Sequence, residues 1–203
     1  MNKRIFVLLP IALLTLTGCN KDKKGDDDPG SSVSEIVIDK SVISPFIEEG
    51  KTYPSSAYQF EISGIHFDAT AGVGVANVSS KGSSGYNELN ALQLKKDAAT
   101  IKNTDEFAAT KIVIEWLATY DSEESKYWPK ASAGATTALS AVTAAESSPL
   151  AGTATGKKQQ GGDSKDHDVY SFVSTFNLPA GTKYFSVGDS GGATYITKIT
   201  ISK

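Results

Sequence analysis

The chain has 203 residues, of which 39% are hydrophobic and 9% aromatic, a composition typical of globular proteins and unlike that of disordered or collagen-like chains. Beyond residue 18 it holds 18 lysines, no arginine and 23 acidic residues, so this part has a formal charge of −5. A net-negative surface without arginine is unsuited to nucleic acids and other polyphosphates, which we exclude as partners.

The first eighteen residues have the layout of an export signal. A basic start precedes an apolar run over residues 5–16, which is too short to span a membrane. The run leads into Leu16-Thr17-Gly18-Cys19, which resembles the bacterial lipobox. In a lipobox a signal peptidase cuts before the cysteine, whose sulfur receives a diacylglycerol. The resemblance implies a signal peptide over residues 1–18 and lipidation of Cys19, the single cysteine of the chain.

Residues 19–32 hold the lipidated cysteine and a polar stretch. This stretch, Asn20 to Ser32, has no apolar side chain to bury and includes proline and glycine, so we predict a disordered tether. Its lysines and aspartates are similar to the export signal on surface lipoproteins of Bacteroidota-type bacteria. That resemblance implies a lipid-anchored outer-membrane protein facing the cell exterior. A solvated spacer that faces the periplasm is the alternative.

From residue 33 to 203, apolar residues recur mostly at every second position between glycine, asparagine, proline and serine, which predicts one all-β domain. The expected strands cover residues 35–43, 57–62, 89–94, 100–102, 111–120, 168–176, 183–187 and 193–202. These short strands suit a sandwich of two antiparallel sheets.

In the strand 111–120, one face holds Ile112, Ile114, Trp116 and Ala118 and the other Val113, Glu115 and Leu117, so we expect both faces to be partly covered. The strand 168–176 has its heavier face at Tyr170, Phe172 and Phe176, and the strand 193–202 places Tyr195, Ile199 and Ile201 together. Residues 70–80 and 131–156 are mixed in pattern and stay unassigned, because alanine, serine and threonine there suit a short helix as well as a strand. Residues 157–166 predict a long exposed loop.

Two groups of segments resemble known domains. Residues 89–96, 100–104 and 111–116 resemble the middle of jelly-roll domains on extracellular polysaccharide-active proteins of gut Bacteroidota. Residues 178–189 and 191–201 are similar to the closing hairpin of galactose-binding-like and carbohydrate-binding-module jelly rolls. The resemblance implies a jelly-roll β-sandwich that binds carbohydrate.

Sugar binding needs exposed aromatic faces with polar groups at the rim, and loops supply both. In the segment 120–130, Tyr120, Tyr127 and Trp128 lie among charged residues, so they are the candidate ligand-binding side chains. Asp189 could line the same rim. The alternative for Trp128 is an anchor that folds back over the sandwich edge, and for Asp189 a simple turn.

Metal and catalytic signals are weak. Asp163, Asp166 and Asp168 offer oxygens for a structural calcium ion, but their spacing matches no specific calcium loop, so we predict no cofactor. The two histidines, His66 and His167, leave too few ligands for a zinc cluster, and a Ser-His-Asp site would have to use one of these two. We therefore expect no catalytic residues.

The expected function is that of a non-catalytic cell-surface lipoprotein that binds polysaccharide through aromatic loop residues. Its expected partners are the membrane, through the lipid on Cys19, a glycan, and neighbouring surface proteins. The first alternative is a structural or adhesive surface protein that assembles through an exposed sheet edge. The second is a small polysaccharide lyase or hydrolase with a pair of carboxylates.

Overall fold

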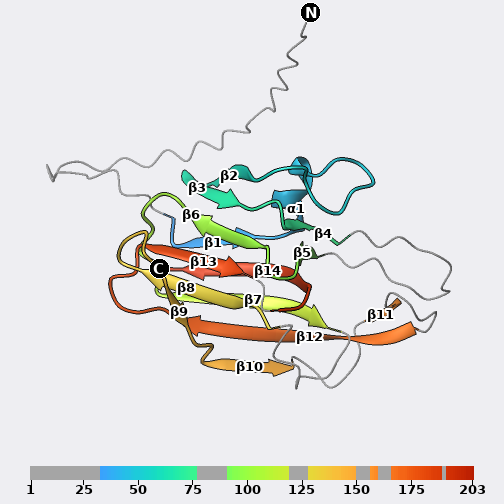
Figure 1. The fold of residues 1–203 in the computed structure, drawn as a ribbon. Helices are drawn as coiled ribbons and strands as arrows, with labels where there is room; N and C mark the ends of the chain where they lie inside the picture. The colour runs from blue at the N-terminus through green and yellow to red at the C-terminus, as the bar shows by residue number, and fades with distance from the viewer. Residues whose placement is uncertain (1–32, 77–90, 119–127, 150–155, 160–165, 189–190) are drawn as a thin grey trace, which may run out of the picture. The chain divides into compact units, whose positions relative to one another are not determined.

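A computed structural model describes residues 33–76, 91–118, 128–149, 156–159, 166–188 and 191–203 (Figure 1). All of these residues belong to one unit, Ser31–Lys203. The predictions made for residues 1–32, including Cys19, lie outside the described residues.

Two antiparallel sheets form a sandwich (Figure 1). Sheet 1 has the order β10 (Glu146–Pro149), β12 (Asp166–Asn177), β7 (Lys111–Ala118), β14 (Thr194–Ser202), β5 (Leu92–Leu94) and β4 (Val73–Val75). Next to it, β1 (Glu35–Ile38) pairs with β14, and β11 (Gly156–Gln159) pairs with β12. Sheet 2 has the order β2 (Tyr58–Ile62), β3 (Ile65–Ala69), β6 (Thr100–Asn103), β13 (Tyr184–Gly188), β8 (Lys130–Gly134) and β9 (Ser140–Val142). A short helix α1 (Lys40–Ile43) and a 3-10 turn η1 (Ser44–Phe46) follow β1.

The strand pairing is that of a jelly roll. β5 pairs with β14, β6 with β13, β7 with β12, and β8 with β9. Between β5 and β8, and again between β12 and β14, each successive strand lies in the opposite sheet. This is a long hairpin folded so that its strands alternate between the two sheets, and the predicted all-β jelly-roll sandwich is confirmed.

The inner faces of both sheets form one hydrophobic core. In β7, Ile112, Ile114 and Trp116 form the buried face and Val113, Glu115 and Leu117 are half-buried, so both faces are partly covered as predicted. In β12, Phe172 and Phe176 are buried, so the predicted heavier face of this strand lines the core.

The last strand corrects one prediction. Tyr195 was expected beside Ile199, but it lies on the outer face, and Ile196 takes the buried position. The ladder with β7 has an irregularity between Ile196 and Lys198, where an extra residue, Thr197, bends the strand. One inserted residue reverses which side chains face the core, and alternation read from the sequence cannot detect it.

Five segments also differ from the expected strand map. The strand expected over 35–43 ends at Ile38, because the Asp39 carboxylate accepts a hydrogen bond from the Ser41 N–H and caps α1. The expected loop 157–166 contains β11, and the unassigned residues 131–156 contain parts of β8, β9 and β10. β3 and β4 were not predicted.

The two ends of the described chain meet in sheet 1. β1 pairs with the second half of β14, and the Lys203 N–H donates to the Ser34 carbonyl oxygen at 3.0 Å. The strand that opens the domain therefore lies directly beside the strand that closes it.

Candidate functional site

The loop residues predicted to bind sugar are only partly described. Tyr120, Tyr127 and Asp189 lie outside the described residues. Trp128 is half-buried and packs against the hydrophobic core. This packing is the one expected of a loop anchor, while sugar binding by Tyr120, Tyr127, Trp128 and Asp189 stays a prediction.

A groove of about 370 Å³ lies on the outer face of sheet 2, where β2, β3 and β6 run side by side. It is lined by Ala57, Tyr58, Gln59, Asp68, Ala69, Thr70, Thr100 and Lys102. Its volume is within the range of small-ligand sites in proteins. We therefore treat this groove as the candidate site.

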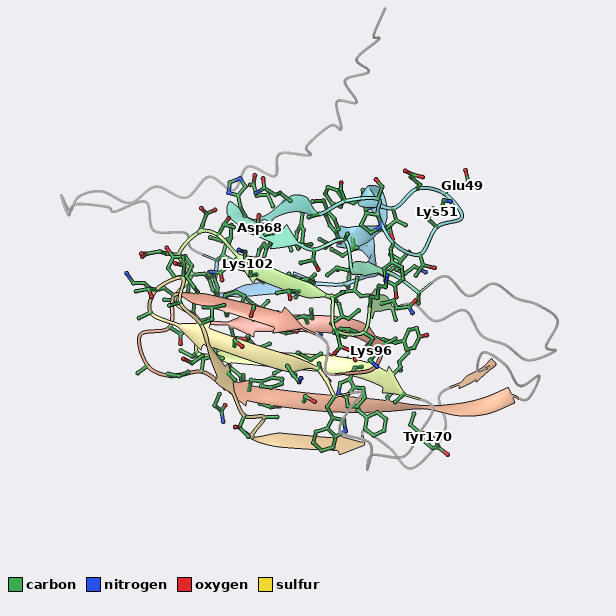
Figure 2. All side chains as sticks on the ribbon, in the orientation of Figure 1. Glu49, Lys51, Asp68, Lys96, Lys102 and Tyr170 are labelled. Atoms are coloured by element: carbon green, nitrogen blue, oxygen red, sulfur yellow. The ribbon has the colours of Figure 1, made fainter. Side chains whose placement is uncertain are left out.

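Three polar side chains form a connected row across the groove. Gln59 Nε2 donates to Asp68 Oδ1 at 2.7 Å, and Lys102 Nζ lies 3.5 Å from Asp68 Oδ2. Asp68 and Lys102 project from neighbouring strands on the same side of the sheet (Figure 2). The row thus places an amide, a carboxylate and an ammonium group next to one another on the surface of the sheet.

The strand register produces this row. Gln59 lies opposite Asp68, and Asp68 lies opposite Lys102. The same register continues to Ser186 of β13 and Ser132 of β8, whose side chains are small. The polar row therefore runs onto a flatter part of the sheet surface, where a ligand meets little steric obstruction.

The floor and one end of the groove are held by hydrogen bonds to the backbone. Thr70 Oγ1 donates to the Ala98 carbonyl at 2.7 Å and accepts from the Thr100 N–H at 3.0 Å. The Tyr58 hydroxyl donates to the Val73 carbonyl at 3.2 Å, and burial raises the pKa of Tyr58 well above its ordinary value. These bonds fix the groove before any ligand binds, which favours recognition.

A second polar cluster lies on the same face of sheet 2, around His66. His66 Nδ1 is 2.6 Å from Asp105 Oδ2, and its Nε2 is 3.5 Å from Glu61 Oε2. Both nitrogens of the ring face carboxylates, and the His66 N–H also donates to Asp105 at 2.9 Å. This arrangement is an exposed ion-pair cluster.

The cluster predicts an altered histidine titration. The hydrogen bond to Asp105, with the charges of Asp105 and Glu61, raises the pKa of His66, and the backbone hydrogen bond from His66 lowers the pKa of Asp105. We expect Asp105→Asn to lower the pKa of His66 toward its ordinary value in an NMR titration. Asp68→Asn is the control, because Asp68 does not contact His66. A His66 pKa that is unchanged in Asp105→Asn would contradict the pairing.

The sign of the accompanying stability change follows from these shifts. Because the pKa of His66 is raised in the folded protein, the contribution of His66 to the free energy of unfolding is complete below the ordinary histidine pKa. This contribution is lost as the pH rises through the raised value. The lowered pKa of Asp105 means that its contribution is lost as the pH falls through the lowered value. Because the cluster is exposed, solvent screens both contributions.

The part of the chain that the structure describes contains no arrangement of side chains typical of a metal site. There, no group of three or more histidine, cysteine, aspartate or glutamate side chains is arranged to hold a metal ion. The calcium candidate Asp163 lies outside the described residues, and the side chains of Asp166 and Asp168 in β12 are not described. Calcium there stays a prediction.

The groove residues were not singled out in the sequence, because they come from three strands and only pairing brings them together. One signal could have found them: Ser63-Gly64 is a two-residue turn that fixes the pairing of β2 with β3. Applied to residues 58–69, it places Gln59 opposite Asp68. The third member, Lys102, depends on a pairing 34 residues away along the chain.

In comparisons with known proteins, no family model, curated protein or solved structure matches the chain. Within the described ranges, every helix falls short of the length and apolar character needed to cross a membrane.

Proposed function

We propose that this chain is a non-catalytic, lipid-anchored surface protein that binds a neutral glycan in the groove of sheet 2. The observation that supports this most is the row formed by Gln59, Asp68 and Lys102. An amide, a carboxylate and an ammonium supply both donors and acceptors, which sugar hydroxyl groups need in pairs.

The charge of this face favours a neutral ligand. Asp68 offsets the charge of Lys102, and Glu61 and Asp105 add negative charge nearby on the same face. An anionic glycan would therefore be repelled, whereas a neutral sugar exchanges its bonds with water for bonds to the row. Because the groove is at the surface and water competes there, we expect weak affinity for a single sugar unit.

Affinity electrophoresis of the full chain on neutral and acidic polysaccharides tests the proposal. We expect retardation on a neutral polysaccharide and about a tenfold weaker affinity for Lys102→Met, because a hydrogen bond to a charged group contributes about 1.5–3 kcal/mol. Lys198→Met is the matched control, since Lys198 forms a similar exposed ion pair with Glu115, at 3.2 Å, on sheet 1. Equal retardation of both variants and the unchanged chain would exclude the groove.

The same assay distinguishes glycan binding by the loop around Trp128 from glycan binding in the groove. If the loop binds the glycan, Trp128→Ala abolishes retardation and Lys102→Met leaves it unchanged. If the groove binds the glycan, Lys102→Met weakens the retardation and Trp128→Ala leaves it unchanged. Because Trp128 packs against the core, the unfolding midpoint of Trp128→Ala must be measured alongside.

Lipid attachment is tested at Cys19. We expect Cys19→Ser to move the protein from the membrane fraction to the soluble fraction and to abolish incorporation of labelled fatty acid. Each buried CH₂ of an acyl chain contributes about 0.8 kcal/mol to membrane binding, so the loss should be large. Lys21→Ser is the control, because it alters the neighbouring polar stretch and leaves the sulfur in place. Fatty-acid labelling that persists in Cys19→Ser would contradict the assignment.

A further inference from the structure

β2 is an edge strand of sheet 2, and among the described strands it pairs only with β3. Ser63 and Gly64, at φ 53° and 80°, form a two-residue turn of the mirror-image type, whose flanking residues Ile62 and Ile65 share hydrogen bonds. Pairs along an antiparallel ladder alternate between hydrogen-bonded and non-hydrogen-bonded. Gln59 and Glu61 are therefore in non-hydrogen-bonded pairs, and their backbone N–H and C=O groups point to the open side of β2.

The hydrogen bonds of β3 support this assignment. His66, the residue opposite Glu61, donates its backbone N–H to Asp105 and accepts at its carbonyl from the Thr104 N–H at 2.9 Å. Both backbone groups of His66 are thus directed away from β2. Glu61 must then direct its own backbone groups away from β3, toward the open edge.

Among the features that usually prevent edge strands from pairing, this edge has one charged residue, Glu61, and lacks several others. β2 has no proline, lysine or bulge, and its five residues are in unbroken register with β3. By contrast, Thr52 covers the edge at β4, where its carbonyl accepts from the Val75 N–H, and β10 includes Pro149. The other edge strands that the structure describes, β1, β9 and β11, are shorter than β2.

The exposed aromatic ring at this edge adds apolar surface. Phe46 is 38% exposed, and among the described residues it is the one large hydrophobic side chain that is exposed to solvent. Its ring stacks on Tyr58 of β2 with 4.7 Å between centroids. Open backbone groups and uncovered apolar surface therefore occur together at one edge.

We propose that β2 pairs antiparallel with β2 of a second copy of this chain, centred on Phe60. In this register Gln59 lies opposite the second copy's Glu61, and Glu61 lies opposite the second copy's Gln59. The open N–H and C=O groups of these four residues then form hydrogen bonds with one another across a two-fold axis. On the outer face the Gln59 amide can donate to the Glu61 carboxylate. Tyr58 lies opposite the second copy's Ile62, which covers apolar surface next to Phe46.

Pairing of this kind joins sheet 2 of one copy to sheet 2 of the other copy, which gives one continuous sheet. Gln59 also lines the groove, so the two grooves come to lie near each other on a shared face. This last consequence, a bivalent glycan site, rests on the proposed function. The strand pairing itself does not, since it follows from the backbone groups of β2.

Register-specific disulfide formation in the full chain tests the pairing. In a Cys19→Ser background, one chain has Gln59→Cys and a differently tagged chain has Glu61→Cys. Opposite residues have Cα atoms about 5.5 Å apart, within disulfide range. Two copies of Cys at position 59 are offset by two residues, about 9 Å apart, and cannot bridge. The thiols are oxidised by dioxygen with copper(II) phenanthroline as the catalyst. Each disulfide releases two electrons and two protons, which reduce one dioxygen to hydrogen peroxide.

We expect the disulfide-linked dimer only when the two variants are mixed, and we expect excess Cys19→Ser chain to suppress it. Cross-linking in every sample would indicate non-specific association, for example through the apolar residues 5–16, and would overturn the proposal. Cross-linking of one variant with itself alone would overturn the register. No cross-link in the mixture, with circular dichroism showing both variants folded, would overturn the pairing. A glycan assay on the same chains reports separately on the groove.

Discussion

Replacing Trp116 with alanine is expected to lower the free energy of unfolding by about 3–5 kcal/mol, which is a large part of the roughly 5–15 kcal/mol of a typical domain. Trp116 is 1% exposed at the centre of β7, and its ring stacks on Phe172 of β12 with 4.5 Å between centroids. Its indole N–H donates to Ser174 Oγ at 3.0 Å. The substitution therefore removes core volume, an aromatic pair and a buried hydrogen bond together.

Urea denaturation followed by circular dichroism measures this loss. Trp116→Phe separates the contributions, because it keeps most of the buried volume and removes the indole N–H; we expect a loss of about 1–3 kcal/mol. Leu117→Ala is the control on the same strand, since Leu117 points to the outer face of sheet 1 and is only half-buried. Equal losses in Trp116→Ala and Leu117→Ala would show that the ring does not lie in the core.

Replacing Asn103 with leucine is expected to cost about 3 kcal/mol or more, although leucine is close in size and more hydrophobic. Asn103 is 4% exposed, and its Nδ2 donates to the Asp105 and Lys183 carbonyls at 2.7 and 2.8 Å. Its Oδ1 accepts from the Phe185 N–H at 2.6 Å. The β6–β13 ladder ends at Lys102 and Ser186, so this one side chain continues the pairing where the two strands separate.

Hydrogen exchange distinguishes this role from a general loss of stability. In Asn103→Leu the Phe185 amide should exchange faster than amides of β7 and β12, since it loses its acceptor in a buried place. Thr104→Ala is the neighbouring control, because the Thr104 hydroxyl is exposed and donates a longer bond of 3.2 Å to the His66 carbonyl. Unchanged protection of Phe185 in Asn103→Leu would mean that the bond contributes little.

The sequence predicted the fold where hydrophobic alternation is long and regular. The predictions for β7 and β12 were correct because large apolar side chains recur at every second position around Trp116 and Phe172 in strands of eight and twelve residues. β8 was missed because Ala131 and Ala133 are small, and only their packing under the opposite sheet makes them buried. Alanine favours helices and is depleted in strands, so its local preference does not predict β8 and tertiary contacts decide.

The candidate site was less predictable than the fold. Aromatic residues on loops were the expected binding groups, whereas the groove consists mainly of polar strand residues whose neighbours are set by register. Ser63-Gly64 encodes one of those pairings locally. The pairing of Asp68 with Lys102 depends on contacts between distant segments, which a local pattern does not contain.

The contact between Ser34 and Lys203 bears on how the protein can be re-engineered. Because the first and last strands are adjacent, a short linker could join the two ends and new ends could be opened in a surface turn, giving a circular permutant with the same two sheets. Opening the chain at Ser63-Gly64 would turn β2 into the terminal strand, still held by its ladder to β3. Such a permutant would have its free chain ends at the far end of the β2–β3 hairpin from the groove, where a fused reporter or a second binding module would leave the groove unobstructed.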